Sequence, residues 1–208
     1  MNALLKLITL LTLTLSVQAC ALTGAPITGK VLEEGTNNPI PGAIVAVTWI
    51  GRTTSGSIYV ESGDVCYHVE TVTTNEQGFY QTQAWSQEQH KDYTVKFDHK
   101  QVTAYKAGYG VPQRSSQKDG VEYLAKFKGT REERLEYLWR MRPSCDAQNE
   151  SEENKLPLLK ALYDEAKLHG GDKKPAPNTM SLMESIVYDI EIIEFGFEEA
   201  ESRHLKRP

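Results

Sequence analysis

The sequence predicts a mainly β protein with α-helices: about seven strands, followed by a segment of about three helices. Short β-prone runs separated by turn residues recur between residues 27 and 127. The composition changes at Lys128, and apolar residues then recur at helical spacing. The first nineteen residues have the makeup of a secretory signal rather than of a folded element. We therefore divide the chain into a signal peptide (1–19), a tether (20–26), a β-domain (27–127) and a helical region (128–208).

The β-domain opens with a predicted hairpin. Residues around Val31 form a short extended run, and 43–50 (AIVAVTWI) form an apolar, β-branched run typical of a buried strand. Between the two runs stand residues that disfavour a helix: Gly35, Asn37, Asn38, Pro39, Pro41 and Gly42.

Further strands are predicted at 65–74, 79–82, 93–97, 102–105 and 121–127, with a polar loop over 85–91. Gly78 stands where a tight hairpin needs a positive φ. About seven strands over a hundred residues, with turn signals at short intervals, predict a β-sandwich.

Three helices are predicted after Lys128. The first opens with a capping box, Thr130 to Glu133, and ends at Pro143. The second spans the apolar positions from Leu158 to Leu168 and stops at residues 170–171 (GG). The third begins at Asn178 or Thr179 and carries an apolar stripe from Met183 to Phe197. Such a stripe usually packs in a core, and a partner-binding helix is the alternative.

The N-terminus predicts export. Residues 7–17 are apolar apart from Thr and Ser, follow a single Lys, and are too few to span a bilayer, which takes about 20 residues. Residues 17–20 (VQAC) resemble a bacterial lipobox, in which Cys20 would be lipidated. Gln18 departs from the small residue usual there, so ordinary cleavage after Ala19 or Ala21 is the competing reading. We expect a lipoprotein on the periplasmic side of a bacterial membrane, or a free periplasmic or secreted protein if Cys20 is not lipidated.

The chain has three cysteines, Cys20, Cys66 and Cys145. Without Cys20 the mature fold keeps two in an oxidising compartment, which predicts a Cys66–Cys145 disulfide. Two buried thiols, or a thiol that pairs between chains, are the alternatives.

Three blocks of sequence resemble the carboxypeptidase regulatory-like family. The first combines residues 29–31 (GKV), 39–43 (PIPGA) and 45–47 (VAV). The second is 73–80 (TTNEQGFY), and the third is 102–109 (VTAYKAGY). The resemblance implies a transthyretin-like β-sandwich over about residues 27–110. It implies little about function, because such sandwiches serve as accessory domains in peptidases, outer-membrane transporters and surface proteins.

Enzyme signatures are missing. No His-x-x-Glu zinc pair occurs among the five histidines: His68, His90, His99, His169 and His204. The chain ends LKRP, without the Tyr-Arg-Gly-Ser ending of transthyretin-like hydrolases. It also lacks a Gly-x-Ser-x-Gly elbow, a P-loop and a dinucleotide glycine pattern. We therefore expect a non-enzymatic protein without a cofactor.

Two further patterns could bind ligands. Cys66, His68 and Glu70 alternate along a predicted strand, which would place a thiol, an imidazole and a carboxylate on one face as metal ligands in a small metal-binding protein or hydrolase. The commoner explanation of such a pattern is that Cys66 is a disulfide or core residue and that His68 and Glu70 lie on a solvated face of the sheet. Several aromatic residues could form a carbohydrate or peptide platform, although most should pack inside: Tyr59, Tyr67, Tyr80, Trp85, Tyr105 and Tyr109.

Taken together, the sequence predicts an exported binding or scaffold protein of the cell envelope. A partner protein or peptide could add as a strand to an edge of the sandwich. The membrane would be reached only through the lipid at Cys20. Nucleic acid is an unsuitable partner, because the net charge is −5 and no basic run is interleaved with aromatic residues.

Overall fold

The computed structural model describes residues 21–54, 64–88, 94–112, 120–143, 152–173 and 180–206. Within these residues the fold is mainly β with α-helices, as the sequence predicts. The strands are β1 (Ala21–Gly24), β2 (Thr28–Glu33), β3 (Ile44–Thr54), β4 (Asp64–Thr73), β5 (Phe79–Gln81), β6 (Trp85–Glu88), β7 (Thr94–Tyr105), β8 (Tyr109–Gly110) and β9 (Val121–Lys126). The helices are α2 (Arg131–Arg140), the short 3₁₀ helix η1 (Glu152–Lys155), α3 (Leu156–Leu168), α4 (Leu182–Phe195) and α5 (Phe197–Leu205).

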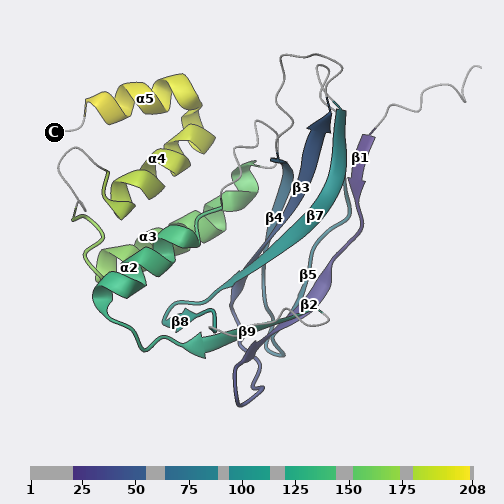
Figure 1. The fold of residues 1–208 in the computed structure, drawn as a ribbon. Helices are drawn as coiled ribbons and strands as arrows, with labels where there is room; N and C mark the ends of the chain where they lie inside the picture. Colours follow the sequence, from purple (N-terminus) through teal and green to yellow (C-terminus); the bar gives the residue numbers. More distant parts are fainter. Residues whose placement is uncertain are drawn as a thin grey trace, which may run out of the picture.

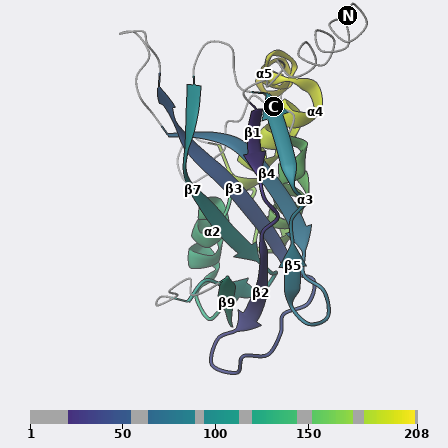
Figure 2. The same ribbon diagram turned by 90° about the vertical axis from the view of Figure 1, so that its right-hand side faces the viewer.

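The strands form three sheets in the described part of the chain. One sheet has the order β4-β3-β7, a second the order β5-β2-β9-β8, and a third pairs β1 with β6. All pairs are antiparallel except β2 with β9. Figure 1 shows the helices on one side of the β4-β3-β7 sheet and β1, β2 and β5 on the other. Figure 2, turned by 90°, shows β1, β2 and β5 in front of that sheet and the helices behind it.

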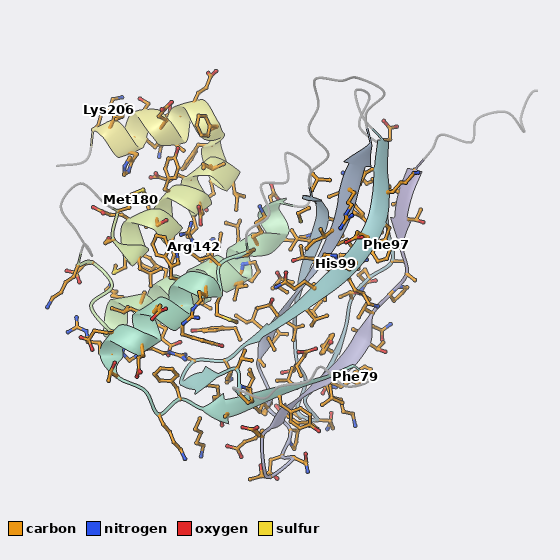
Figure 3. The ribbon with its side chains drawn as sticks, viewed as in Figure 1. Phe79, Phe97, His99, Arg142, Met180 and Lys206 are labelled. Atoms are coloured by element: carbon orange, nitrogen blue, oxygen red, sulfur yellow. The ribbon has the colours of Figure 1, made fainter. Side chains whose placement is uncertain are left out.

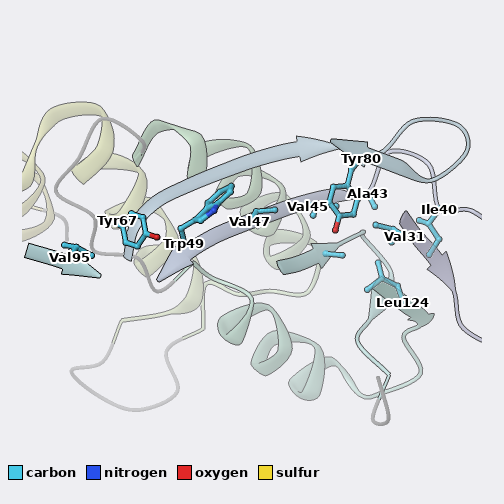
Figure 4. Packing of buried hydrophobic residues seen from close by; sticks show 11 residues of the cluster. Val31, Ile40, Ala43, Val45, Val47, Trp49, Tyr67, Tyr80, Val95 and Leu124 are labelled. Carbon is cyan, nitrogen blue, oxygen red and sulfur yellow. The ribbon is translucent and has the colours of Figure 1, made fainter. Parts of the chain in front are cut away.

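The hydrophobic core has two parts, one on each face of the β4-β3-β7 sheet. The inter-sheet cluster, shown in Figure 4, joins residues of both larger sheets: Val31, Ile40, Ala43, Val45, Val47, Trp49, Tyr67, Tyr80, Val95, Ala104 and Leu124. The helix-facing cluster joins the opposite face to the helices: Ala46, Tyr105, Leu138, Met141, Leu158, Leu159, Leu162, Ala166, Leu182 and Ile186. Alternate residues of β3 therefore serve different clusters, as a strand covered on both faces requires.

Several predicted elements form as expected. The capping box at Thr130 is present, with both Glu133 hydrogen bonds made. α3 ends before Gly170 and Gly171. Gly78 has a φ of 70°, and a side chain there would collide with the Val31 carbonyl oxygen. Local signals were sufficient in these places, because the capping box, the end of α3 and the turn bond from the Gly78 amide to the Asn75 carbonyl oxygen each lie within a few residues.

Other predictions were wrong. Part of the expected tether is strand β1, and part of the expected 85–91 loop is its partner β6. Two strands were predicted, at 93–97 and 102–105, but residues 94–97 and 102–105 belong to one strand, β7, which pairs with β3 along its whole length. The polar and charged residues 98–101 (DHKQ) between the two apolar runs lie within this strand.

The third helix also differs from the prediction. Its capping residue is Ser181, which forms a capping box with Glu184, and not Asn178 or Thr179. Gly196, with a φ of 85°, ends α4, so Phe197 begins α5 instead of continuing the stripe. Ile186 packs in the helix-facing cluster and Met183, Ile190 and Ile193 pack against it, which confirms core packing for that part of the stripe.

Candidate functional site

A groove of about 500 Å³ runs along the outer side of β7. Its lining comes from β7, from β9 and from the end of α2, together with Val111: His99, Lys100, Gln101, Val102, Thr103, Ala104, Glu122, Tyr123, Leu124, Arg140 and Met141. We call it the β7 groove. Strands form two of its walls, so its shape follows from the sheet topology.

The topology explains why the groove exists. In the described residues β7 has β3 as its strand partner and is the outermost strand of its sheet. β9 pairs with β2 along one side, whereas β8 covers the other side only at Ala125 and Lys126. The stretch of β9 from Val121 to Leu124 therefore faces the groove beyond the end of β8.

β7 carries features that protect an outer strand from uncontrolled pairing. The register with β3 shifts between Ile50 and Gly51, so Asp98 is an extra residue at a bulge. Charged side chains crowd the same stretch, namely Lys96, Asp98 and Lys100, and Figure 3 labels Phe97 and His99 there. Asp98 Oδ2 lies 2.7 Å from His99 Nδ1, and Asp98 Oδ1 lies 3.8 Å from Arg52 Nε. From Gln101 onward toward Tyr105 these charges are absent.

The groove contains two cationic side chains and one carboxylate, besides His99. Lys100 is exposed on β7, and Arg140 is exposed at the end of α2. Arg140 Nη2 lies 3.0 Å from Glu136 Oε1, in an ion pair whose side chains are both about two-thirds exposed. Such a pair contributes little to stability and is easily exchanged. Glu122 of β9 is half-buried on the opposite wall.

The predicted metal ligands do not share one face. Trp49 pairs with His68, but the next residue, Ile50, pairs with Cys66, so Tyr67 is the extra residue of a β-bulge. Val65 and Tyr67 both pack with the inter-sheet cluster, which turns Cys66 toward the opposite face, on the side of the helices. His68 and Glu70 stay on the inter-sheet side with their partners Trp49 and Val47. One inserted residue thus separates the thiol from the other two groups, and no set of three His, Cys, Asp or Glu side chains arranged for a metal occurs among the described residues.

His68 instead belongs to an aromatic stack. Its ring lies 4.0 Å from that of Trp85 at an interplanar angle of 17°, and 5.2 Å from the Trp49 ring. Burial lowers the pKa of His68 to about 4, because charging the imidazole there would cost hydration. Glu70 Oε1 accepts a hydrogen bond of 2.7 Å from the Gln83 amide, although burial outweighs this bond and raises the pKa of Glu70.

The other predicted aromatic residues are mostly core. Tyr67, Tyr80 and Tyr105 are at most 6% exposed, which confirms the expectation of internal packing for them. Trp85 and Tyr109 are half-buried against the inter-sheet cluster. Tyr59 lies outside the described residues. Those of these side chains that the structure describes therefore stabilise the sheets and do not line the groove.

The remaining histidines stand apart from one another. His99 is exposed at the bulge of β7. His169 follows α3, with Nε2 3.8 Å from Glu165 Oε1, and the ring of His204 lies 5.4 Å from that of Tyr188. His90 lies outside the described residues.

A buried ionic network, which the sequence did not indicate, joins the sheets to the helices. The Arg134 guanidinium donates to both carboxylate oxygens of Glu165, at 3.0 and 2.7 Å, and also donates to the Tyr109 carbonyl oxygen. Glu165 also accepts hydrogen bonds from the Tyr105 hydroxyl, at 2.6 Å, and from the Gly108 amide, at 3.0 Å. Burial alone would raise the pKa of Glu165, but these hydrogen bonds outweigh it and lower that pKa. The network fixes α2 and α3 on the end of β7, and so fixes one end of the groove.

Lys100 and Arg140 are the groove residues that sequence reasoning missed. The available signal was the charged run 96–100 (KFDHK), because charges inside a strand mark an outer strand. Arg140 lies far from this run in sequence, so only the fold brings the two cations to one groove.

Cys20 and Cys145 lie outside the described residues, so the predicted lipidation and disulfide remain predictions. The helices that the structure describes are each too short or too polar to cross a membrane.

Comparison with known proteins identifies no relative. No protein-family model matches the chain, and neither a curated protein nor a solved structure matches it.

Proposed function

We propose that the chain is an exported, non-enzymatic binding or scaffold protein of the cell envelope that holds a partner segment in the β7 groove. The observation that carries this proposal is the groove itself, whose walls are β7, the outermost strand of its sheet in the described residues, and the stretch of β9 that β8 does not pair with. Extended peptides commonly bind such edges by adding a strand, with main-chain hydrogen bonds providing affinity.

We further propose that the β-rich region is a transthyretin-like sandwich of the carboxypeptidase regulatory-like type. The motif blocks of the resemblance fall on β2, β3, β5 and β7, and each of these strands contributes to the inter-sheet cluster. The packing of two sheets around one cluster is what a sandwich requires. In this reading, the helices α2 to α4 cover the outer face of one sheet.

The positions of the ionisable groups support a binding role over catalysis. Among the groups with shifted pKa values, His68 and Glu165 are enclosed in packed clusters with structural partners, and Asp98, whose pKa is lowered mainly by its hydrogen bond to His99, is exposed outside the groove lining. A general acid or base has to reach a substrate, and these groups do not line the β7 groove.

The proposed anchor is a lipid on Cys20, the residue immediately before β1. Mass spectrometry of the mature protein from an exporting bacterium tests it: we expect a diacylglyceryl mass on an N-terminal Cys20. A terminus at Ala21, or at Cys20 without acyl mass, would instead indicate the free periplasmic or secreted form.

Strand binding can be tested by selecting extended peptides from a display library against the purified mature protein. We expect backbone NMR shifts on binding to concentrate in residues 99–104 of β7 and 121–124 of β9. Alternate N-methylation of the peptide should abolish binding, because it removes main-chain donors without altering the protein. Selected peptides that shift other surfaces, or that bind equally well when N-methylated, would contradict the proposal.

A further inference from the structure

A second groove, of about 420 Å³, lies among the helices and shares no lining residue with the β7 groove. Its lining comes from α2, from the residues that follow α3 and from the start of α4: Arg131, Glu132, Leu135, Glu136, Trp139, Gly170, Gly171, Lys173 and Leu182. We call it the helix groove. Ligand pockets of this size commonly lie between packed helices.

Trp139 forms a wall of the helix groove and is held from its other side. It is 45% exposed, and the Arg142 guanidinium lies 4.9 Å from the centroid of its ring (Figure 3 labels Arg142). Arg142 in turn donates from Nε and Nη2 to Asp189 Oδ2, at 2.9 and 2.6 Å. Because Arg142 does not line the groove, the indole stands between this ion pair and the groove. An exposed ring fixed in this way loses little conformational freedom when a ligand stacks on it.

The inner part of the helix groove is apolar and firmly placed. Leu182 is buried and Leu135 is half-buried, and both pack with the helix-facing cluster. The Arg131 guanidinium donates from Nε to the His169 carbonyl oxygen and from Nη2 to that of Gly170, the latter at 3.4 Å. A β-carbon built on Gly170 would overlap this guanidinium, so the glycine allows Arg131 to lie there. These contacts fix α2 against the end of α3 and the start of α4.

The charged side chains of the helix groove are balanced in sign. Arg131 and Lys173 supply two positive charges, and Glu132 and Glu136 supply two negative charges. All four residues are exposed, and the 3.0 Å ion pair of Glu136 with Arg140 is exposed and easily exchanged. A ligand with a net charge of either sign would therefore meet two groups of like charge.

From this arrangement we infer that the helix groove is a binding site for a neutral saccharide. The C–H face of a pyranose ring is apolar and can stack on the Trp139 indole and contact Leu135. Sugar hydroxyls both donate and accept, so they can donate to the carboxylates of Glu132 and Glu136 and accept from the Lys173 ammonium. A purely apolar ligand would offer these charged groups no hydrogen bond. This site does not depend on the peptide binding proposed for the β7 groove.

The test measures binding of chitotriose, cellotriose and maltotriose to the mature protein by NMR. We expect at least one of these neutral trisaccharides to bind saturably and to shift the Trp139 indole N–H signal. Trp139→Ala should weaken that binding by about tenfold, as the loss of a central aromatic anchor does. Phe97→Ala is the matched control, because it removes a ring that is 58% exposed on β7, outside the helix groove, and it should leave the affinity unchanged.

A second measurement tests the balance of charge without altering the indole. Lys173→Glu changes the lining from two positive and two negative charges to one positive and three negative charges. The variant should shift the preference between chitotriose and its cationic, deacetylated trimer toward the cation by about threefold. Lys96→Glu, an exposed change on β7 outside the helix groove, should not shift this preference.

The remaining outcomes would overturn the inference. Absence of saturable binding by all three trisaccharides would do so, as would equal affinity in the wild type and Trp139→Ala. A proline-rich peptide that shifts the Trp139 signal where no saccharide does would assign the groove to a protein partner. Saccharide binding that appears only after residues 174–179 are replaced by a Gly-Ser linker would assign it to the chain's own segment. A concentration-dependent dimer that Trp139→Ala abolishes would assign it to a second copy.

Discussion

Arg134 of α2 and Glu165 of α3 form an ion pair that is almost fully removed from solvent. Arg134 Nη2 lies 2.7 Å from Glu165 Oε2, and the two side chains are 2% and 5% exposed. The guanidinium also lies 4.8 Å from the centroids of both the Phe127 and the Tyr137 rings. Because Tyr105 and Tyr109 bond to the same pair, it links both ends of the β7–β8 turn to the helices. The helical region is thus held to the sheet by a polar contact as well as by the helix-facing cluster.

Removal of one partner of this pair should be costly. Arg134→Met leaves the Glu165 carboxylate buried without its counter-ion, and we expect a loss of about 3–5 kcal/mol in the free energy of unfolding, measured by urea denaturation. Arg140→Met is the control, because its pair with Glu136 is exposed and should contribute less than about 1 kcal/mol. The double variant Arg134→Met/Glu165→Leu should lose less than Arg134→Met alone, since no charge then remains buried. A double variant that is less stable than either single variant would contradict this account.

The same pair predicts an acid-sensitive stability. The pKa of Glu165 is lowered in the folded state, so the unfolded chain takes up the proton first as the pH falls. The stabilisation is fully present above the ordinary carboxyl pKa of about 4.5 and is lost as the pH falls below it. We expect the difference in stability between the wild type and Glu165→Gln to be constant from pH 7 to 5 and to shrink below pH 4.5. A difference that stays constant down to pH 3 would contradict a lowered pKa.

Protonation of His68 should lower the stability of the protein at higher pH than protonation of Glu165 does. Its folded-state pKa of about 4 lies below its ordinary value of 6.5, so between these values the unfolded chain is protonated while the folded protein is not. The stability should therefore fall by up to about 2 kcal/mol as the pH drops from 6.5 to 4, after allowance for partial exposure. His68→Phe keeps a ring against Trp85 and should remove this slope from thermal or urea unfolding. His99→Gln, at an exposed position, should leave the slope unchanged, and equal slopes in the wild type and His68→Phe would refute the assignment.

Gly24 and Trp85 give a test of strand β1. Gly24 pairs with Trp85, and a β-carbon built on Gly24 would overlap the Trp85 indole nitrogen. Gly24→Val should therefore displace the indole or detach β1 from β6, with a red-shift of the tryptophan emission and a loss of about 1–3 kcal/mol. Thr23→Val, one residue earlier in the same strand, should preserve the emission. An unshifted spectrum in Gly24→Val would indicate that residues 21–24 form a tether after all.

The parts of the fold that sequence predicted are those governed by nearby residues. The capping box of Thr130 and Glu133 and the turn at Gly78 each depend on contacts that a short segment contains. The bulge at Tyr67 does not, because only the pairing of β4 with β3 reveals the extra residue that turns Cys66 to the other face. β1 and β6 escaped prediction because their pairing spans some sixty residues and neither shows apolar alternation. The β7 groove is less predictable still, since Lys100 and Arg140 line one groove only once α2 is fixed by Arg134 and Glu165.

The bulge at Tyr67 turns Cys66 away from His68 and Glu70, and it also directs this thiol to the side from which Cys145 could form a disulfide with it. Cys66 faces the side of the helices, and three residues further along β4 the Val69 carbonyl oxygen accepts a 2.9 Å hydrogen bond from Asn154 Nδ2. Asn154 belongs to η1 and lies nine residues after Cys145. A chain of that length can reach about 30 Å, so Cys145 can approach Cys66 from the same side.

We therefore expect mass spectrometry of the non-reduced mature protein to find Cys66 linked to Cys145. Cys66→Ser and Cys145→Ser should each lower the free energy of unfolding by roughly 4 kcal/mol, the value for a closed loop of about 80 residues in the chain-entropy model. The double variant should lose no more than either single variant, because both changes remove the same bond. Dithiothreitol should destabilise the wild type to the level of the variants and leave the variants unchanged. Two thiols per mature chain that react with a thiol reagent under non-reducing conditions would refute the bond, and additive losses in the double variant would assign each sulfur a separate packing role.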